Sequence, residues 1–213
     1  MRERGVGGVL CVTSDAHEGL RRAIEEVFPG AAWQRCVVHL MRNAASCAPT
    51  RQKRGAVLAI LHAVFDERDP ELVRELYHLA CGEIGGICPK AAELLEDAEA
   101  DALAYLDFPY AHHRRLRTNN VQERANRELK RRSRVVQVFP SRKSLIRMLG
   151  AVFSEMDEDW ATRRWFTEES IAQALAPAKP TAPAPAYEGT AEEHARRIID
   201  VVIADNPIGR KAA

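Results

Sequence analysis

The sequence has few aromatic residues, almost no net charge and no long apolar run. Phe, Trp and Tyr make up 6% of its 213 residues, so a hydrophobic core has to be built from aliphatic side chains and alanine. The formal net charge of +1 means that any affinity for nucleic acid must come from local patches of charge. The longest apolar stretch, residues 55–65, is interrupted by His62 and is too short to cross a bilayer, so no membrane partner is expected.

The cysteine content excludes a disulfide framework of the kind found in small secreted proteins. The five cysteines are odd in number and irregularly spaced. Residues 1–8 are charged and glycine-rich, and they do not have the apolar segment of a signal peptide. We therefore expect a cytoplasmic protein, associated with the nucleoid if its partner is DNA. The length allows one large domain or two small ones.

The first forty residues have the pattern of a strand, a helix and a second strand. Residues 8–14 form a short β-branched run that ends at Asp15, residues 16–30 carry one helical apolar stripe, and residues 33–39 resemble another strand. This order predicts a βαβ unit with parallel strands. Ligand sites in such sheets gather at the carboxyl ends of strands, where Asp15 lies. An aspartate there also commonly caps the next helix, so the residues alone leave both roles open.

Helical spacing dominates from residue 40 to residue 176. Prolines at 49, 70, 89 and 109 mark boundaries within an all-helical segment at 48–113, which is either a plain bundle or an insertion in a sheet domain. A further amphipathic helix is predicted after Pro140. Its apolar stripe, expected to pack in the core, comprises Leu145, Met148, Leu149, Val152, Phe153 and Met156.

The C-terminal part of the chain has a different composition. Residues 177–186, PAKPTAPAPA, have the composition of an extended linker. Residues 187–213 are interpreted as a tail with one short helix that ends near Val202.

A basic stretch stands out from this nearly neutral chain. Residues 114–134 contain nine Lys or Arg against two Glu, and Thr118, Asn119 or Asn120 can cap the helix that they predict. One interpretation is a solvated helix with internal ion pairs, because residues four apart share a face. The other is a strip that binds the phosphates of DNA. The candidate DNA-binding residues are Arg117, Arg124, Arg127, Lys130, Arg131, Arg132 and Arg134.

Two strings of residues resemble the Mutator-type transposases of bacterial insertion sequences. One is N-x-x-E-R-x-N-R-E-x-K-R-R followed by R-V-V-x-x-F-P, at residues 120–140. The other is V-T-S-D-A-H-E-G-L followed by F-P-G-A-x-W-Q-R-C-x-x-H, at residues 12–39. The two blocks occur in the family's order, and the resemblance extends over roughly residues 5–176. Gln137 stands where glycine is common in that family.

The resemblance implies a fold, a chemistry and a site. The fold is an α/β, RNase H-like core at 1–47 and 114–176, here lacking its first strands, with the all-helical insertion between the two parts. The family uses two Asp and one Glu to hold Mg²⁺ or Mn²⁺, and the resemblance identifies Asp15 as the second Asp and Glu123 as the Glu. The implied reaction cuts DNA at the element ends and transfers the strand to target DNA. The implied partners are DNA and a homo-oligomer or a full-length transposase.

The resemblance also shapes what we expect of this chain alone. The family's first catalytic Asp precedes the block that begins at Arg2, so we expect a truncated chain with little strand transfer by itself. A non-catalytic DNA-binding protein or inhibitor, or a metal-dependent nuclease without transposition, are the alternatives. Cys36 and His39 form a C-x-x-H pair, which is either half of a zinc site or a buried thiol beside an imidazole that supports the carboxylates.

Overall fold

The structure, a computed structural model, describes residues 3, 5–161, 166–176 and 187–207. The predicted linker at 177–186 lies outside these residues. The described strands are β1 (Cys11–Ser14) and β2 (Ala32–Arg35). The first helices are α1 (Glu18–Val27), α2 (Val37–Cys47), α3 (Arg51–Asp66), α4 (Pro70–Ile87), α5 (Pro89–Glu96) and α6 (Glu99–Ala102). They are followed by the 3₁₀ helix η2 (Ala104–Asp107) and by α7 (Tyr110–Leu116), α8 (Asn120–Val136), α9 (Arg142–Ala161), α10 (Glu168–Leu175) and α11 (Ala191–Asp205).

The predicted βαβ unit is confirmed, with shorter strands. β1 and β2 pair in parallel, with Ser14 opposite Arg35, and α1 connects them. The prediction that the second strand runs to His39 is wrong, because helix α2 already begins at Val37. Val37, Leu40, Met41 and Ala44 are buried at helical spacing, so packing of α2 against the helical bundle decides how an ambiguous apolar run folds.

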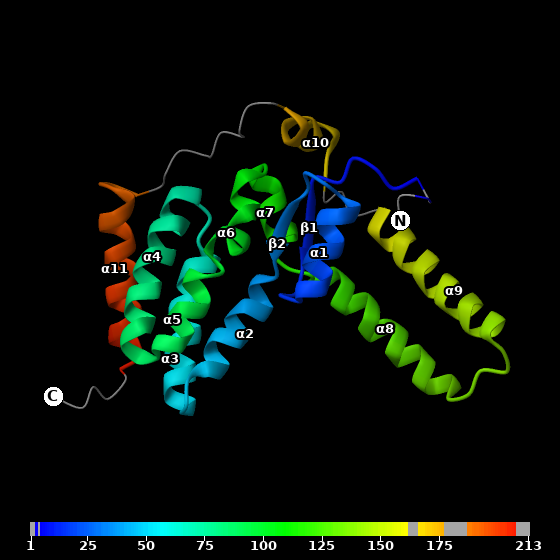
Figure 1. Cartoon of the computed structure of the whole chain (residues 1–213), viewed down its shortest axis with the longest axis horizontal. Coiled ribbons are helices and arrows are strands. Elements are labelled where there is room, and N and C mark those ends of the chain that lie inside the picture. Colours follow the sequence, from blue (N-terminus) through cyan, green and yellow to red (C-terminus); the bar gives the residue numbers. More distant parts are fainter. Residues whose placement is uncertain (1–2, 4, 162–165, 177–186, 208–213) are drawn as a thin grey trace.

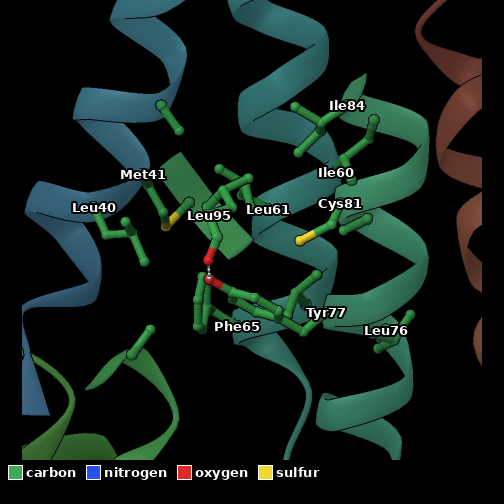
Figure 2. Close-up of a cluster of buried hydrophobic side chains, with 14 of the residues drawn as sticks. Leu40, Met41, Ile60, Leu61, Phe65, Leu76, Tyr77, Cys81, Ile84 and Leu95 are labelled. Atoms are coloured by element: carbon green, nitrogen blue, oxygen red, sulfur yellow. Dashed lines mark hydrogen bonds between the residues drawn. The ribbon is translucent and has the colours of Figure 1, made fainter. Parts of the chain in front are cut away.

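The core of the chain is a helical bundle beside this small sheet. Buried side chains of α2, α3, α4 and α5 form one cluster, which Figure 2 shows around Tyr77 and Leu61. The Tyr77 hydroxyl donates a hydrogen bond to the Leu95 carbonyl oxygen at 2.6 Å, and burial raises the pKa of Tyr77 well above its usual value. Pro70 and Pro89 occupy the first turns of α4 and α5, as predicted. None of the described helices combines the length and apolar character that membrane crossing requires.

The C-terminal helix α11 lies beside α4 and completes this core (Figure 1). The predicted helix is confirmed, and it extends to Asp205. Thr190 and Glu193 form a reciprocal capping box at its start. Ala195 and Ile199 are buried in the same cluster as the bundle side chains. Residues beyond the family resemblance therefore belong to the packed core of the bundle.

Helices α8 and α9 form a hairpin that extends away from the bundle (Figure 1). Within the predicted stripe of α9, Val152 is buried, whereas Leu145, Met148, Leu149 and Met156 are partly buried. The expectation that Phe153 packs in the core is wrong, because 46% of its surface is exposed. The reason is that one face of α9 packs along α8, and the face of α9 that carries Phe153 is left uncovered.

The turn between these helices contains a strained residue. Gln137 ends α8 with φ 57° and ψ −58°, and among the described residues it is the only non-glycine with a positive φ. This conformation is readily adopted by glycine, the residue that the family resemblance places here.

Replacing Gln137 with Gly is expected to raise the free energy of unfolding by about 1 kcal/mol. Backbone strain at a non-glycine residue costs about 1–3 kcal/mol, and the greater freedom of glycine in the unfolded chain offsets part of the gain. Urea denaturation measures the change. Gln137→Ala is the control, because it keeps the Cβ atom and should bring no gain. A glycine variant no more stable than the alanine variant would contradict the assignment of strain.

Candidate functional site

The two strands end at the same edge of the sheet and place two polar side chains there. Asp15 follows β1 directly, and Cys36 follows β2 directly and precedes the first residue of α2. Cys36 is fully buried, whereas the Asp15 side chain is 54% exposed. The Cys36 backbone N–H donates to the Ser14 carbonyl oxygen at 2.8 Å, which holds the two strand ends together.

The segment before α8 is fixed to this edge by two hydrogen bonds and to α3 by a third. The Thr13 hydroxyl donates to the Leu116 carbonyl oxygen at 2.5 Å, and the Val37 N–H donates to the Arg117 carbonyl oxygen at 2.9 Å. The Arg117 guanidinium donates to the carbonyl oxygen of Phe65 in α3. These bonds join the segment to β1, α2 and α3, so the first turn of α8 lies beside the carboxyl ends of the strands.

His39 lies between the two predicted catalytic carboxylates. Its Nδ1 atom is 2.5 Å from Asp15 Oδ1, and its Nε2 atom is 3.2 Å from Glu123 Oε1. Asp15 and Glu123 are 108 residues apart in the sequence, and the fold brings both to one imidazole ring. The Nδ1 atom is buried, and its contact with Asp15 does not have the alignment of a hydrogen bond. The contact is therefore a close approach of the carboxylate oxygen to the ring nitrogen.

Asn119 is a site residue that the sequence did not reveal. It occupies the N-cap position of α8, one of the three cap candidates, yet its side chain makes no capping hydrogen bond. Its Nδ2 atom donates instead to Asp15 Oδ1 at 3.1 Å, and its Oδ1 atom accepts from Cys36 Sγ at 3.1 Å. Asn119 therefore links the strand ends to α8. The sequence cannot distinguish this role from helix capping, because asparagine is a common residue for both.

The donor atoms in this cluster suit a divalent metal ion. Ligand atoms of Asp15, Cys36 and His39 lie within 4.8 Å of one another, and this is the only such group of three found among the described residues. Glu123 approaches from the other side of the imidazole. Two carboxylates match the oxygen preference of Mg²⁺ and Mn²⁺, and an imidazole nitrogen is better accepted by Mn²⁺ than by Mg²⁺. Asp15 and His39, with Glu123 on the far side of the ring, therefore offer donors that such an ion accepts, whereas the Cys36 thiol in the same group is a softer ligand that it does not prefer.

A row of cations begins at this cluster and follows one face of α8. Glu123, Arg127, Lys130 and Arg134 are spaced at i, i+4, i+7 and i+11, which places them on one side of the helix. The three cations and Arg124 are largely exposed, and their side chains have no ion-pair partner in the described part of the chain. At 1.5 Å per residue the row extends about 16 Å from Glu123.

The other cations of this stretch bind partners within the chain. Arg131 and Arg132 donate to Glu128 at 2.6 and 2.9 Å, and Arg132 also pairs with Glu155 of α9 at 2.7 Å. Hydrogen bonds from Arg131 and then Arg132 lower the pKa of Glu128 to about 2. Arg117 is directed into the protein, toward Phe65. The interpretation as internal ion pairs thus holds for Arg131 and Arg132, and the binding of DNA by the unpaired cations stays a prediction.

Comparison with known proteins shows which family this chain belongs to. Residues 1–163 match the family described as "Transposase, Mutator family". The chain belongs to this family. The resemblance drawn from residues 12–39 and 120–140 is thereby confirmed at the level of the Mutator family of transposases.

Several relatives are named as transposases of insertion sequences. The chain is 41% identical over 174 residues to the transposase for insertion sequence element IS1081 of Mycobacterium tuberculosis, which covers 81% of this chain and 42% of the relative. It is 40% identical over 163 residues to the IS406 transposase of Burkholderia multivorans, covering 75% and 41%. It is 33% identical over 162 residues to the IS256 transposase in transposon Tn4001 of Staphylococcus aureus, also covering 75% and 41%. The matched region thus spans about two fifths of these relatives.

Proposed function

We propose that this chain contributes to DNA cleavage and strand transfer in transposition, through metal-dependent phosphodiester chemistry. Asp15 and Glu123 are the proposed carboxylate ligands of Mg²⁺ or Mn²⁺. The observation that supports the proposal most is the convergence of these two carboxylates on His39, at the carboxyl ends of parallel strands. Membership of a transposase family adds the substrate class, DNA.

Each residue of the cluster has a role in this proposal. Divalent ions held by carboxylates activate the attacking oxygen and stabilise the leaving oxygen in a displacement at phosphorus. Asp15 and Glu123 supply oxygen ligands, and His39 keeps them apart and oriented. Asn119 holds Asp15 by its amide N–H and so fixes the carboxylate relative to α8. Cys36, which is fully buried, donates to Asn119 and holds its side chain in place.

The row of cations on α8 gives the DNA backbone a path to this cluster. Arg127, Lys130 and Arg134 lie on the same helical face as Glu123, so phosphates bound along the row would lead to the carboxylates. Arg124 lies on a neighbouring part of the helix. We propose these four as the DNA-binding residues. Arg117, Arg131 and Arg132 act through their partners within the chain.

The finer features implied by the family are part of the same proposal. The β1–α1–β2 unit would belong to an RNase H-like sheet, and the bundle of α3–α7 would be the insertion between Asp15 and Glu123. The described residues bring two carboxylates to the cluster, whereas the proposed chemistry uses three. We therefore propose that this chain alone transfers strands poorly and acts with another copy or with a longer transposase.

DNA binding and its dependence on salt test the role of α8. We expect affinity for duplex DNA to fall steeply as salt rises, and Lys130→Ala to reduce the slope of log K against log salt by about 0.9, because one phosphate contact is lost. Fluorescence anisotropy with a labelled duplex measures both quantities.

Two matched variants separate this contact from a general loss of charge. Arg131→Ala removes an adjacent exposed cation that is already paired with Glu128, and Arg196→Ala removes an exposed cation on α11. Both should change the slope less than Lys130→Ala. Equal effects of all three, or binding that ignores salt, would refute the proposed DNA contact.

A non-catalytic DNA-binding protein or inhibitor is the second candidate function. The observation that favours it is that the described cluster contains two carboxylates. Asp15→Asn and Glu123→Gln separate the two functions in a transposition assay with a longer relative. An inhibitor keeps its effect in these variants, whereas a catalytic contribution is lost.

A further inference from the structure

The face of α9 that points away from α8 is built around a glycine. With 3.6 residues per turn, one exposed surface is centred on Gly150, and the partly buried apolar residues lie on the opposite side, against α8. We call it the outer face of α9. Its members, all exposed, are Lys143, Ile146, Arg147, Gly150, Phe153, Ser154 and Asp157.

Nothing in the described part of the chain accounts for glycine at position 150. A Cβ atom built there would meet no described atom within 4 Å beyond its own helix. Glycine in the middle of a helix makes the helix less stable than alanine would. No contact within the described chain requires a glycine here to offset that loss. A glycine flanked on the same face by exposed Ile146 (55%) and Phe153 (46%) would allow the backbone of another element to approach closely.

The charges on this face are separated along the helix. Lys143 lies near the start of α9 and Asp157 near its end, and Arg142 and Glu158 add a further cation and a further carboxylate at the same two ends. Lys143 and Asp157 are 14 residues apart, which is about 21 Å along a helix, so they cannot pair within one copy. Neither has an ion-pair partner among the residues that the structure describes.

We propose that the outer face of α9 binds the same face of a second copy, with the two helices antiparallel. Lys143 and Asp157 are each seven residues from Gly150, so a two-fold axis beside Gly150 places Lys143 of either copy opposite Asp157 of the other. Around the glycine, the aliphatic Ile146 and the ring of Phe153 cover each other across the axis. The face is therefore complementary to itself.

The charge pattern favours a second copy over DNA as the occupant. A phosphate backbone attracted by Lys143 and Arg147 would be repelled by Asp157 and Glu158 on the same helix. An antiparallel copy instead brings the basic end of each helix against the acidic end of the other and covers the apolar centre. The inference names the surface of the homo-oligomer in the proposed function, and it does not depend on metal binding or on phosphodiester chemistry.

Charge reversal tests the pairing. Sedimentation equilibrium of the whole 213-residue chain should show a monomer–dimer equilibrium. Lys143→Glu and Asp157→Lys should each weaken dimerisation by about tenfold or more, because both symmetric pairs become repulsive. An equimolar mixture of the two variants should restore it. In the heterodimer the introduced glutamate of one chain faces the introduced lysine of the other, and the unchanged Asp157 faces the unchanged Lys143. Only the antiparallel arrangement produces this rescue.

Two further variants make the result decisive. Gly150→Leu should abolish dimerisation while circular dichroism shows an unchanged helical fold, because the position is open in one copy. Arg196→Glu on α11 should leave dimerisation unchanged. A wild-type chain that stays monomeric, a mixture that is not rescued, or an equal effect of Arg196→Glu would each overturn the proposal. DNA binding by the α8 cations is measured separately, so failure of one idea is distinguishable from failure of the other.

Discussion

Replacing Asp15 with Asn is expected to weaken binding of Mn²⁺ to this chain by at least about a hundredfold. Loss of a residue that only hydrogen-bonds to a metal ligand already lowers metal affinity by about 10–100-fold, and loss of a ligand should lower it at least as much. Glu123→Gln should have an effect in the same direction. An amide keeps the size of each side chain but removes the negative charge that a divalent ion requires. Isothermal titration calorimetry and the electron paramagnetic resonance signal of free Mn²⁺ both measure the change.

Two other variants define the site more closely. Asn119→Ala should weaken Mn²⁺ binding by about tenfold, because it removes the amide that orients Asp15 while leaving every ligand in place. Asp66→Asn is the matched control, since this exposed carboxylate lies at the end of α3 and pairs with His62. If Mn²⁺ binds to Asp15→Asn as tightly as to Asp66→Asn, the assignment of Asp15 as a ligand is wrong.

Replacing Gln34 with Ala is expected to reduce the free energy of unfolding by about 3 kcal/mol or more, because each buried polar group left without a partner costs about 1–3 kcal/mol. Gln34 is fully buried in β2. Its Nε2 atom donates to the carbonyl oxygens of Ala102 at 2.9 Å and Arg35 at 2.7 Å. Its Oε1 atom accepts from the Tyr105 N–H at 2.7 Å. One side chain thus joins the sheet to α6 and η2.

Urea denaturation followed by circular dichroism measures this loss. Gln52→Ala is the control, because Gln52 is an exposed glutamine whose Nε2 atom makes one hydrogen bond, to the Pro207 carbonyl oxygen. It should change stability by less than about 0.5 kcal/mol. A Gln34 variant as stable as the Gln52 variant would mean that the buried hydrogen bonds do not hold the sheet against the bundle.

The sequence by itself determined the order of the main elements and the family. Periodicity within short windows shows which face of an element is apolar, so the βαβ unit, the helix starts at Pro70 and Pro89 and the basic helix α8 could be predicted. The position of Asp15 after a strand follows from the same local signal. The two strings of residues identified the Mutator family, which the comparisons confirm.

The tertiary structure decided which distant residues meet. The C-x-x-H pair suggested an imidazole near the carboxylates, but no local pattern places His39 between Asp15 and Glu123. None indicates that Asn119 binds Asp15 instead of capping α8. The same holds for Arg131, which is paired with Glu128, whereas Lys130 beside it has no such partner in the described part of the chain. Sequence spacing fixes neighbours on one element only. Contacts across more than a hundred residues depend on how whole elements pack, because the apolar faces of α2, α3 and α4 set the positions from which polar side chains reach one another.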